Sequence, residues 1–356
     1  MTQVLNRREW IWSSAGGAAA LVLAHRGARA QVPDNVRLKR QTLDFIVRCG
    51  RPDGGYAPSP DPAYAGESDT GFSDLAAVTY AAVLARTMGW KLPRQERSIA
   101  FLRGHQRPDG RFVNLAGKHD PASDLGILYN TTQGVVGLRA LGAEPAIDPL
   151  PCVAKLLAGD AYRKLPWYTT SFFPLLCAAL GKPFPGDWRD KLARHMEQSQ
   201  ASDGYLGDHV AATFHMAHFF RLLGEPTPRA AAMVARVLRD QKPDGGWNIK
   251  EPDWDVHACF DAVFILRQLG GNEPKVKHAI ARGADWSLNC RNPDGGFGHF
   301  PGRPSDMDAV YFQFGTLIQA DLVQGARRDL ADAQTLGWGH AMEPGKLYRT
   351  GPSRRA

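Results

Sequence analysis

The sequence lacks the signatures by which many enzymes and small secreted proteins are recognised. Its five cysteines are odd in number and form no Cys-x-x-Cys pair, so it is not a disulfide scaffold. It contains no glycine-rich phosphate loop, no Gly-x-Ser-x-Gly motif and no His-Glu-x-x-His motif. Stretches typical of β-strands are nearly absent, which favours an all-helical fold. Cys152 and Cys177 lie in apolar surroundings and are expected in the core.

The chain also lacks an apolar run long enough to span a bilayer stably. Its most apolar terminal stretch, residues 11–24, is short and contains several Gly and Ser residues. It follows the pair Arg7-Arg8 and precedes Ala28-Arg29-Ala30, an arrangement that resembles a twin-arginine export signal. We therefore expect cleavage after Ala30 and export to the periplasm, with no transmembrane helix in the mature chain. A retained basic leader or anchor is the alternative.

The positive charge is modest and is not concentrated as nucleic-acid binding requires. The formal net charge is +7, and residues 1–30 contribute four arginines against one glutamate. The C-terminal residues 331–356 include Lys346, Arg349, Arg354 and Arg355. We interpret them as a solvated basic tail, and we expect no nucleic-acid partner.

A short turn recurs along the chain. Its copies are RPDGGY (51–56), RPDGRF (107–112), ASDGYL (201–206), KPDGGW (242–247) and NPDGGF (292–297). Counted from the residue before Asp, the steps are 56, 94, 41 and 50 residues. The long step is about twice the others, so a degenerate copy should lie within it, and residues 162–181 fit its second half. The chain therefore contains about six repeats.

Each repeat is expected to hold two helices joined by the turn. Pro, Asp and Gly stop the first helix, and a second, almost wholly apolar helix follows. An aspartate usually precedes or begins the second helix and should cap it; these are Asp74, Asp124, Asp208, Asp255 and Asp308. Apolar second helices belong inside and amphipathic first helices outside. Six such pairs can close into two concentric layers, which predicts an all-α (α/α)6 toroid over residues 31–330.

The turns resemble the QW-type repeats of terpene cyclases and of protein prenyltransferase β-subunits, with DQKPDGGWN (240–248) as the best copy. The resemblance covers most of the chain, from about Leu38 to Val323. It implies an α/α toroid with a central apolar cavity. It also implies a hydrophobic or isoprenoid small molecule as the binding partner.

In prenyltransferase β-subunits, an Asp-x-Cys at the start of one inner helix and a His at the start of the next bind zinc. The matching positions here are Asp255 and His257, followed by Tyr311. Cys259 lies close by, so the resemblance implies a zinc site with Asp255, His257 and Cys259 as candidate ligands. Tyr311 replaces the family's histidine. Of the basic residues that bind diphosphate in the family, Lys250 alone has a counterpart near the expected place.

The cyclase branch uses Asp-x-Asp-Asp-Thr, whose middle Asp protonates an alkene or epoxide. Residues 253–256, DWDV, keep Asp253 and Asp255 but have Val256 at the last aspartate. By this resemblance Asp255 is the candidate acid and His257 a group that could hold its proton. Asp253 and Tyr311 complete the candidate catalytic set.

Further candidates should line the cavity: Trp167, Tyr168, His215, His218, Lys250 and Asp308. Aromatic faces there could stabilise carbocations. A purely structural role is also open for the whole cluster. In that case Asp255 caps a helix, His257 bonds a backbone carbonyl, and Cys259 and the aromatic residues are core.

The sequence thus predicts an exported toroid that binds an isoprenoid or similar lipid and has transferase or cyclase activity. A non-catalytic binding or scaffold module is a second possibility. A third is a glycan-processing toroid enzyme, which needs two carboxylates facing each other across the cavity.

Overall fold

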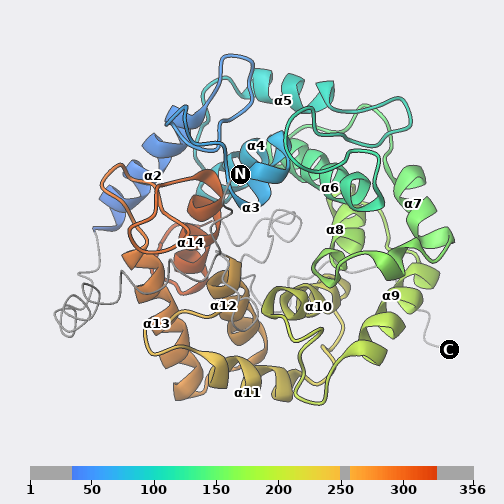
Figure 1. Cartoon of the computed structure of the whole chain (residues 1–356), viewed down its shortest axis with the longest axis vertical. Coiled ribbons are helices and arrows are strands. Elements are labelled where there is room, and N and C mark those ends of the chain that lie inside the picture. Colours follow the sequence, from blue (N-terminus) through green and yellow to red (C-terminus); the bar gives the residue numbers. More distant parts are fainter. Residues whose placement is uncertain (1–33, 249–256, 327–356) are drawn as a thin grey trace, which may run out of the picture. The chain divides into compact units, whose positions relative to one another are not determined.

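The computed structural model describes residues 34–248 and 257–326, all within the unit Asp34–Ala356. These residues form helices and isolated bridges, with no β-strand among them. The helices alternate between an inner and an outer layer arranged around a centre (Figure 1). The expected all-α toroid of six helical pairs is confirmed.

The inner helices are the apolar ones. They are α4 (Asp74–Met88), α6 (Asp124–Ala140), α8 (Phe172–Ala179), α10 (Val210–Leu223), α12 (His257–Leu269) and α14 (Met307–Gln319). Every residue of α14 is buried. An inner helix packs against its outer partner on one side and against neighbouring inner helices on others, so little of its surface remains for water.

The outer helices are amphipathic. They are α2 (Asn35–Cys49), α5 (Gln95–Gly104), α7 (Leu150–Ala158), α9 (Gly186–Ser199), α11 (Ala230–Asp240) and α13 (Pro274–Asn289). In α9 the buried residues are Leu192, Ala193 and Met196, which form a narrow stripe. Shorter helices lie in the connections: α3 (Ser68–Phe72), η1 (Ala161–Lys164) and η2 (Trp167–Thr169). The degenerate repeat is α7 with α8.

The repeated turns join neighbouring repeats. Gly245 has a φ of 99°, and a Cβ there would lie 2.5 Å from the carbonyl oxygen of Arg282 on the next outer helix. Gln241 Nε2 donates to the carbonyls of Gly245 and Ala279, both at 2.9 Å. Glycine is required at this position because the backbone is left-handed and the neighbouring helix is in contact. The turn is therefore a structural joint.

The last turn closes the ring. A Cβ on Gly295 would lie 2.4 Å from the carbonyl oxygen of Gln41, which belongs to the first outer helix. Inside, α14 packs against α4, and the rings of Tyr80 and Tyr311 stack with centroids 4.3 Å apart. Because both layers meet across the closure, neither end of the repeat array requires a polar capping repeat.

The predicted caps of the inner helices are wrong by one or two residues. Ser73 accepts from Leu75 N, Ser123 from Gly126 N and Asp306 from Ala309 N. At α10 the cap is His209. Asp74, Asp124 and Asp308 stand inside the first turn of their helices, where a negative charge still favours the helix dipole. Asp255 lies outside the described residues.

All five cysteines are free and buried. Cys152 and Cys177 are 6% and 1% exposed, as expected of core residues. Among the described residues, none of the helices combines the length and the hydropathy that crossing a membrane requires. The segments 1–30 and 331–356, for which a signal and a tail were predicted, fall outside the described residues.

Candidate functional site

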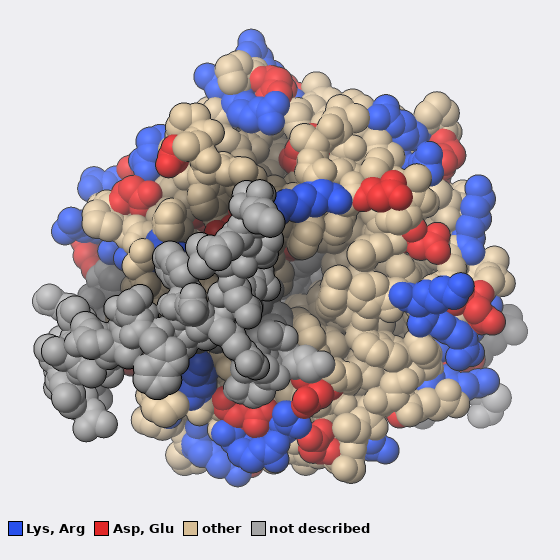
Figure 2. Space-filling model, viewed as in Figure 1, with Lys and Arg blue, Asp and Glu red and all other residues tan. Residues whose placement is uncertain are grey.

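The inner helices and the short helix α3 line a cavity of about 190 Å³ that opens to solvent. Around the visible part of the hollow in Figure 2 most atoms are uncharged, and charged side chains lie mainly toward the margin. The described aromatic lining residues are Phe72, Tyr129, Tyr168, Phe172, Phe214 and Phe312, and the polar ones are Ser68, Asp69, His119, His209, His215, His257 and Asp261.

The short helix α3 brings an aspartate to this wall. α3 packs against α4 and α14, and Asp308 at the start of α14 holds it in place. Asp308 Oδ2 accepts from Thr70 N at 3.0 Å and from Thr70 Oγ1 at 3.2 Å. Asp308 is fully buried, so these charge-assisted hydrogen bonds act where water does not compete. The adjacent residue, Asp69, lines the cavity.

Two phenols lie near the Asp69 carboxylate. Tyr80 donates its hydroxyl hydrogen to Asp69 Oδ2, and the Tyr129 hydroxyl accepts from Gln133 Nε2 at 2.9 Å. Burial, followed by the charge of Asp69, raises the pKa of both phenols well above the usual value. Both phenols therefore remain protonated. The hydrogen bond from Tyr80 stabilises the anion that remains when Asp69 gives up a proton.

His257 stands beside this acid at the start of α12. Its Nε2 lies 3.9 Å from Asp69 Oδ2 and 3.3 Å from Ser68 Oγ. Its ring stacks on Phe312 with centroids 3.8 Å apart. Four residues further on, Asp261 lies on the same face and also lines the cavity.

Three of these groups could hold a metal ion. Asp69, His257 and Asp308 each offer one ligand atom, and these atoms lie within 4.8 Å of one another. Two carboxylates and an imidazole fit a zinc site that keeps an open position. The carboxylates already have hydrogen-bond donors, as metal-bound carboxylates usually do. A second group, His299, Asp306 and Asp308, meets the same distance criterion.

The second group has a structural role. His299 Nε2 lies 2.8 Å from Asp306 Oδ2, and Tyr64 OH donates to the same oxygen at 2.6 Å. Asp306 Oδ1 caps α14 through Ala309 N. These bonds tie the last connection to the start of α14.

On α10, His215 lines the cavity and shares a hydrogen-bond partner with His218. His215 Nδ1 lies 2.7 Å and His218 Nδ1 3.2 Å from the same hydroxyl oxygen, Ser171 Oγ. Burial lowers the pKa of His215 well below its usual value, helped by the nearby histidines, and lowers that of His218 to about 3. Both imidazoles are therefore neutral at physiological pH.

The predicted site residues lie in different parts of the molecule, and only some of them line the cavity. Tyr168, His215 and His257 line the cavity, and Asp308 holds α3. Asp253, Asp255 and Lys250 lie outside the described residues, so their predicted roles stay predictions.

Three predicted residues stand away from the cavity surface. His218 packs beside Phe214 with ring centroids 5.5 Å apart. Trp167 packs against His195 of the outer layer, with ring centroids 4.3 Å apart and the ring planes tilted by 34°. Tyr311 is fully buried against Tyr80.

Cys259 requires a correction as a metal ligand. Its sulfur donates to the Gly283 carbonyl at 3.4 Å and lies 3.8 Å from Ser287 Oγ. Both partners belong to α13, so the thiol faces the outer layer while His257, two residues earlier, faces the cavity. Burial raises the pKa of Cys259 to about 12, as expected of a thiol in the core.

Asp69 was missed by sequence reasoning. It lies in residues 57–73, the stretch between the first turn and its inner helix. That stretch is much longer than residues 207–209 at the corresponding place before α10. The signal that could have revealed Asp69 was an acidic residue in an unusually long connection between an outer turn and an inner helix. The resemblance to zinc-binding proteins points instead to the starts of α12 and α14.

The prenyltransferase α/α toroid domain matches residues 18–135 and 171–341 of the sequence. The chain therefore belongs to this family. Drimenyl diphosphate synthase of Streptantibioticus cattleyicolor is 24% identical over 280 residues, which cover 68% of this chain and 49% of that protein. An uncharacterised protein, y4kT of Sinorhizobium fredii, is 25% identical over 172 residues, 45% of this chain and 32% of that one. The chain thus spans half or less of these curated relatives.

Solved structures share the fold. The type II terpene cyclase MstE from Scytonema has a TM-score of 0.52 at 17% identity, over 82% of this chain and 98% of that one. MstE variants have been solved with geranylgeranyl dihydroxybenzoate, a substrate, and with merosterolic acid A, a product. Protein geranylgeranyltransferase-I of Candida albicans, complexed with GGPP, has a TM-score of 0.55 at 12% identity, over 85% and 98%. Relatives of this fold bind isoprenoids.

Proposed function

We propose that this protein binds an isoprenoid or similar lipid in the central cavity, and that Asp69 starts its cyclisation by protonating a carbon–carbon double bond. The observation that carries the proposal is one carboxyl group that accepts a hydrogen bond from the Tyr80 phenol and lies in a wall of aromatic rings. The family membership and the isoprenoid ligands of its structural relatives support the substrate class.

In this reaction the protonated carboxyl of Asp69 gives its hydrogen to one alkene carbon, and the alkene electrons form the new C–H bond. The tertiary cation that results is attacked by the next double bond, which closes a ring. Aromatic faces such as those of Phe72, Phe214 and Phe312 stabilise the positive charge. Loss of a proton ends the sequence, so the net change is an isomerisation. His257 is placed to help return a proton to Asp69.

The test is an assay of the purified protein with polyprenyl alcohols, diphosphates and phenol adducts, with products identified by mass spectrometry. Asp69→Asn keeps the shape but cannot act as the acid, so turnover should fall by about 10²–10⁴-fold. Asp285→Asn, on the exposed side of α13, is the matched control and should not change turnover. Undiminished turnover in Asp69→Asn would reject Asp69 as the acid. Asp253 and Asp255 would then be the candidate acids.

A zinc-dependent transferase is the second candidate. It is favoured by the grouping of Asp69, His257 and Asp308 within ligand distance. Bound zinc would polarise a leaving group or activate a nucleophile, and the three side chains would hold it. Metal analysis should then find about one zinc per chain, lost in His257→Ala. A metal-free protein that turns over polyprenyl substrates would reject this candidate.

A non-catalytic module and a glycan-processing enzyme would each behave differently in the same assay. A binding or scaffold module would retain lipid without converting it. For a glycan-processing role the two carboxylates would have to be Asp69 and Asp261, which line the cavity, because Asp74 bonds His105 at 3.1 Å, Asp124 is exposed and Asp208 pairs with Arg236 at 2.7 Å. None of these three aspartates lines the cavity.

We also propose that residues 1–30 direct export through the twin-arginine route. The support is the pair Arg7-Arg8 and the small residues ending at Ala30. Replacing both arginines by lysine preserves charge and should block export. Wild-type protein should appear in the periplasm, and its measured mass should equal that of a chain that begins at Gln31. Equal export of the two forms would contradict the proposal.

A further inference from the structure

Building on the proposed function, we propose that His215 is the base that ends the reaction. Its Nε2 removes a proton from the final carbocation, and the choice of that proton sets the position of the last double bond. Ser171 and His218 are positioning residues, because they hold the His215 ring in the form that can accept the proton. The acid and the base of the reaction therefore belong to different parts of the wall.

The first observation is an unusual use of the Ser171 hydroxyl. Ser171 stands at the N-cap of α8, a place where a serine normally accepts a hydrogen bond from the helix. Here its hydroxyl accepts none from the described first turn of α8. Instead, Ser171 Oγ lies 2.7 Å from His215 Nδ1 and 3.2 Å from His218 Nδ1. Ser171 is fully buried, so the two imidazoles take the place of water as its hydrogen-bond partners.

The number of hydrogens in this trio defines its active form. A hydroxyl carries one hydrogen, so Ser171 donates to one Nδ1 and accepts from the other. When Ser171 donates to His218, the ring hydrogen of His215 lies on Nδ1, and His215 Nε2 presents a lone pair. A cation in the cavity favours this form because it is attracted to that lone pair. The trio thus supplies the cavity with a proton acceptor.

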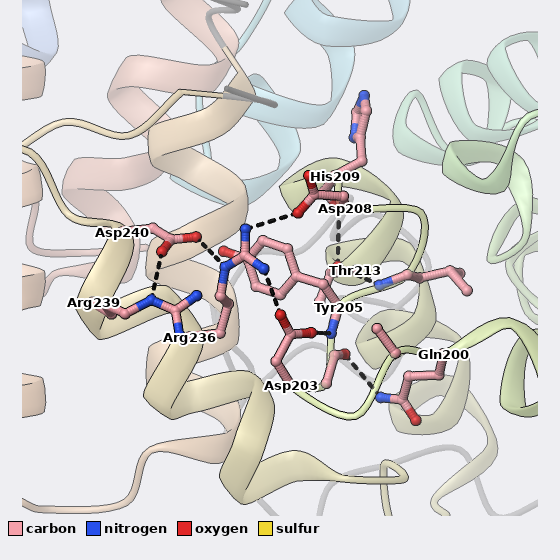
Figure 3. A network of polar contacts seen from close by, with 12 residues as sticks. Gln200, Asp203, Tyr205, Asp208, His209, Thr213, Arg236, Arg239 and Asp240 are labelled. Atoms are coloured by element: carbon pink, nitrogen blue, oxygen red, sulfur yellow. Dashed lines mark hydrogen bonds and ion pairs between the residues drawn. The ribbon is translucent and has the colours of Figure 1, made fainter. Parts of the chain in front are cut away.

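The start of α10 is anchored so that His215 faces inward (Figure 3). Arg236 on α11 pairs with Asp208, just before the helix, at 2.7 Å. Thr213 Oγ1 accepts from Leu206 N at 3.0 Å, so Thr213 faces the outer turn that contains Leu206. Residues two apart on a helix point to nearly opposite sides. His215 is therefore directed to the cavity, which it lines.

His215 is neutral and stands among aromatic rings. Burial, helped by nearby histidines, lowers its pKa well below the usual value, so the ring carries no second proton before the reaction. Its ring centroid lies 4.8 Å from that of Phe214 and 5.3 Å from that of Phe172. Aromatic faces hold a carbocation near this point. A hydrogen next to a cationic carbon is far more acidic than an imidazolium, so a weak base suffices.

His215 also lies away from the acid. Asp69 belongs to α3, which packs against α4 and α14, whereas His215 belongs to α10, which packs against α8 and α12. In Figure 1, α3 and α10 lie on different sides of the ring centre. His257, in contrast, lies 3.9 Å from Asp69. A base remote from the acid leaves room for rings to close along the substrate before the last proton is removed.

The step balances as a proton transfer. The electrons of the broken C–H bond form the last carbon–carbon double bond, and the lone pair of His215 Nε2 forms the new N–H bond. The imidazolium donates its Nδ1 hydrogen to Ser171 Oγ, whose own hydrogen points to His218 Nδ1. The proton then passes to solvent at the cavity opening, and Asp69 takes up another. The protein is restored, and the substrate has been isomerised.

The test follows the position of the double bond in the product. Purified protein is supplied with geranylgeraniol, geranylgeranyl diphosphate and the two farnesyl counterparts, and the products are assigned by mass spectrometry and NMR. His215→Asn replaces the Nδ1 side of the ring by an amide that can still bond Ser171, and it removes Nε2. We expect the ratio of the wild-type isomer to other isomers and to water-captured alcohols to fall at least about tenfold, while substrate consumption changes by less than about threefold.

His278→Asn, on the exposed side of α13, is the matched control and should keep the wild-type isomer ratio. A second variant, His215→Phe, fills the space and also removes the base, so it should change the ratio in the same direction. An unchanged ratio in either folded variant would overturn the role of His215. Loss of all products from both would also overturn it, because His215 would then act before cyclisation. A wild-type protein that converts none of the substrates would instead reject the proposed function, and the base with it.

Ser171→Ala tests the positioning role. His215 keeps Nε2 but loses the partner that fixes its ring hydrogen, so the isomer ratio should fall by roughly threefold. A purely structural role of Ser171 would lower the melting temperature and leave the isomer ratio unchanged. That result would overturn the part assigned to Ser171 and His218.

Discussion

The outer turns and the inward connections of this toroid follow opposite rules. Each outer turn repeats the same solution, in which a left-handed glycine presses against the next outer helix, as Gly245 does against Arg282. The inward connections differ from repeat to repeat, and the residues that cap the inner helices include Ser73, His209 and Asp306. The repeated part builds the ring, and the unrepeated part supplies the chemistry of the cavity.

The largest expected effect is on the turn side. Gly245→Ala should lower the free energy of unfolding by about 3 kcal/mol, because the new Cβ meets backbone in a left-handed conformation. Gly271→Ala is the matched control, with a φ of 63° and nothing within 4 Å of the added atom. It should cost about 1 kcal/mol. Urea unfolding measures both, and equal losses would contradict the role of the turn as a joint between helices.

The next effect is a dependence of the free energy of unfolding on pH, which comes from the buried histidines of the inner helix α10. Because the pKa of His218 is about 3 in the folded state, the unfolded chain alone binds a proton there as the pH falls below about 6.5. Stability should then drop by about 1.4 kcal/mol per pH unit, and continue to drop until the folded pKa is reached. His215, whose pKa is also lowered, adds to the slope. Urea unfolding at several pH values should show a shallower slope in His218→Leu, and an unchanged slope would refute this assignment.

A smaller effect should separate activity from stability. Thr70→Val removes the Oγ1 donor to Asp308 and leaves the backbone donor. Loosening of α3 should reduce turnover by about tenfold, while the free energy of unfolding changes by about 1 kcal/mol. Turnover equal to wild type would mean that Asp308 does not position Asp69.

The smallest effect returns to the turns. Trp247 Nε1 donates to the Val237 carbonyl at 2.8 Å, so Trp247→Phe should cost about 1 kcal/mol of stability. It should leave turnover and ligand affinity unchanged, because the turn lies on the outer side. A large loss of ligand affinity would contradict the view that the outer turns build the ring while the inward connections form the cavity.

Sequence reasoning predicted the ring well because its signals are local. A Pro-Asp-Gly turn, an apolar helix and an amphipathic helix are each recognisable within a short window, and repetition made the pattern secure. The predictions were wrong at the starts of the inner helices, where the identity of a single capping residue had to be chosen. The sequence predicts Asp74 and Asp124 as caps, whereas in the structure the preceding serines cap the helices. A helix entrance offers several side chains that can cap, and packing of the connection decides among them.

By itself, therefore, the sequence determined the all-α ring, the number of its repeats, the inner and outer layers and the family. The tertiary structure decided which polar groups share the cavity. Ser68, which precedes Asp69, and His257 are 189 residues apart, and they become neighbours because helices α3 and α12 both pack against α14. The tertiary structure also decided that Cys259 faces α13 while His257 faces inward. No local pattern encodes such choices, because the orientation of a side chain on a fully buried helix depends on every helix around it.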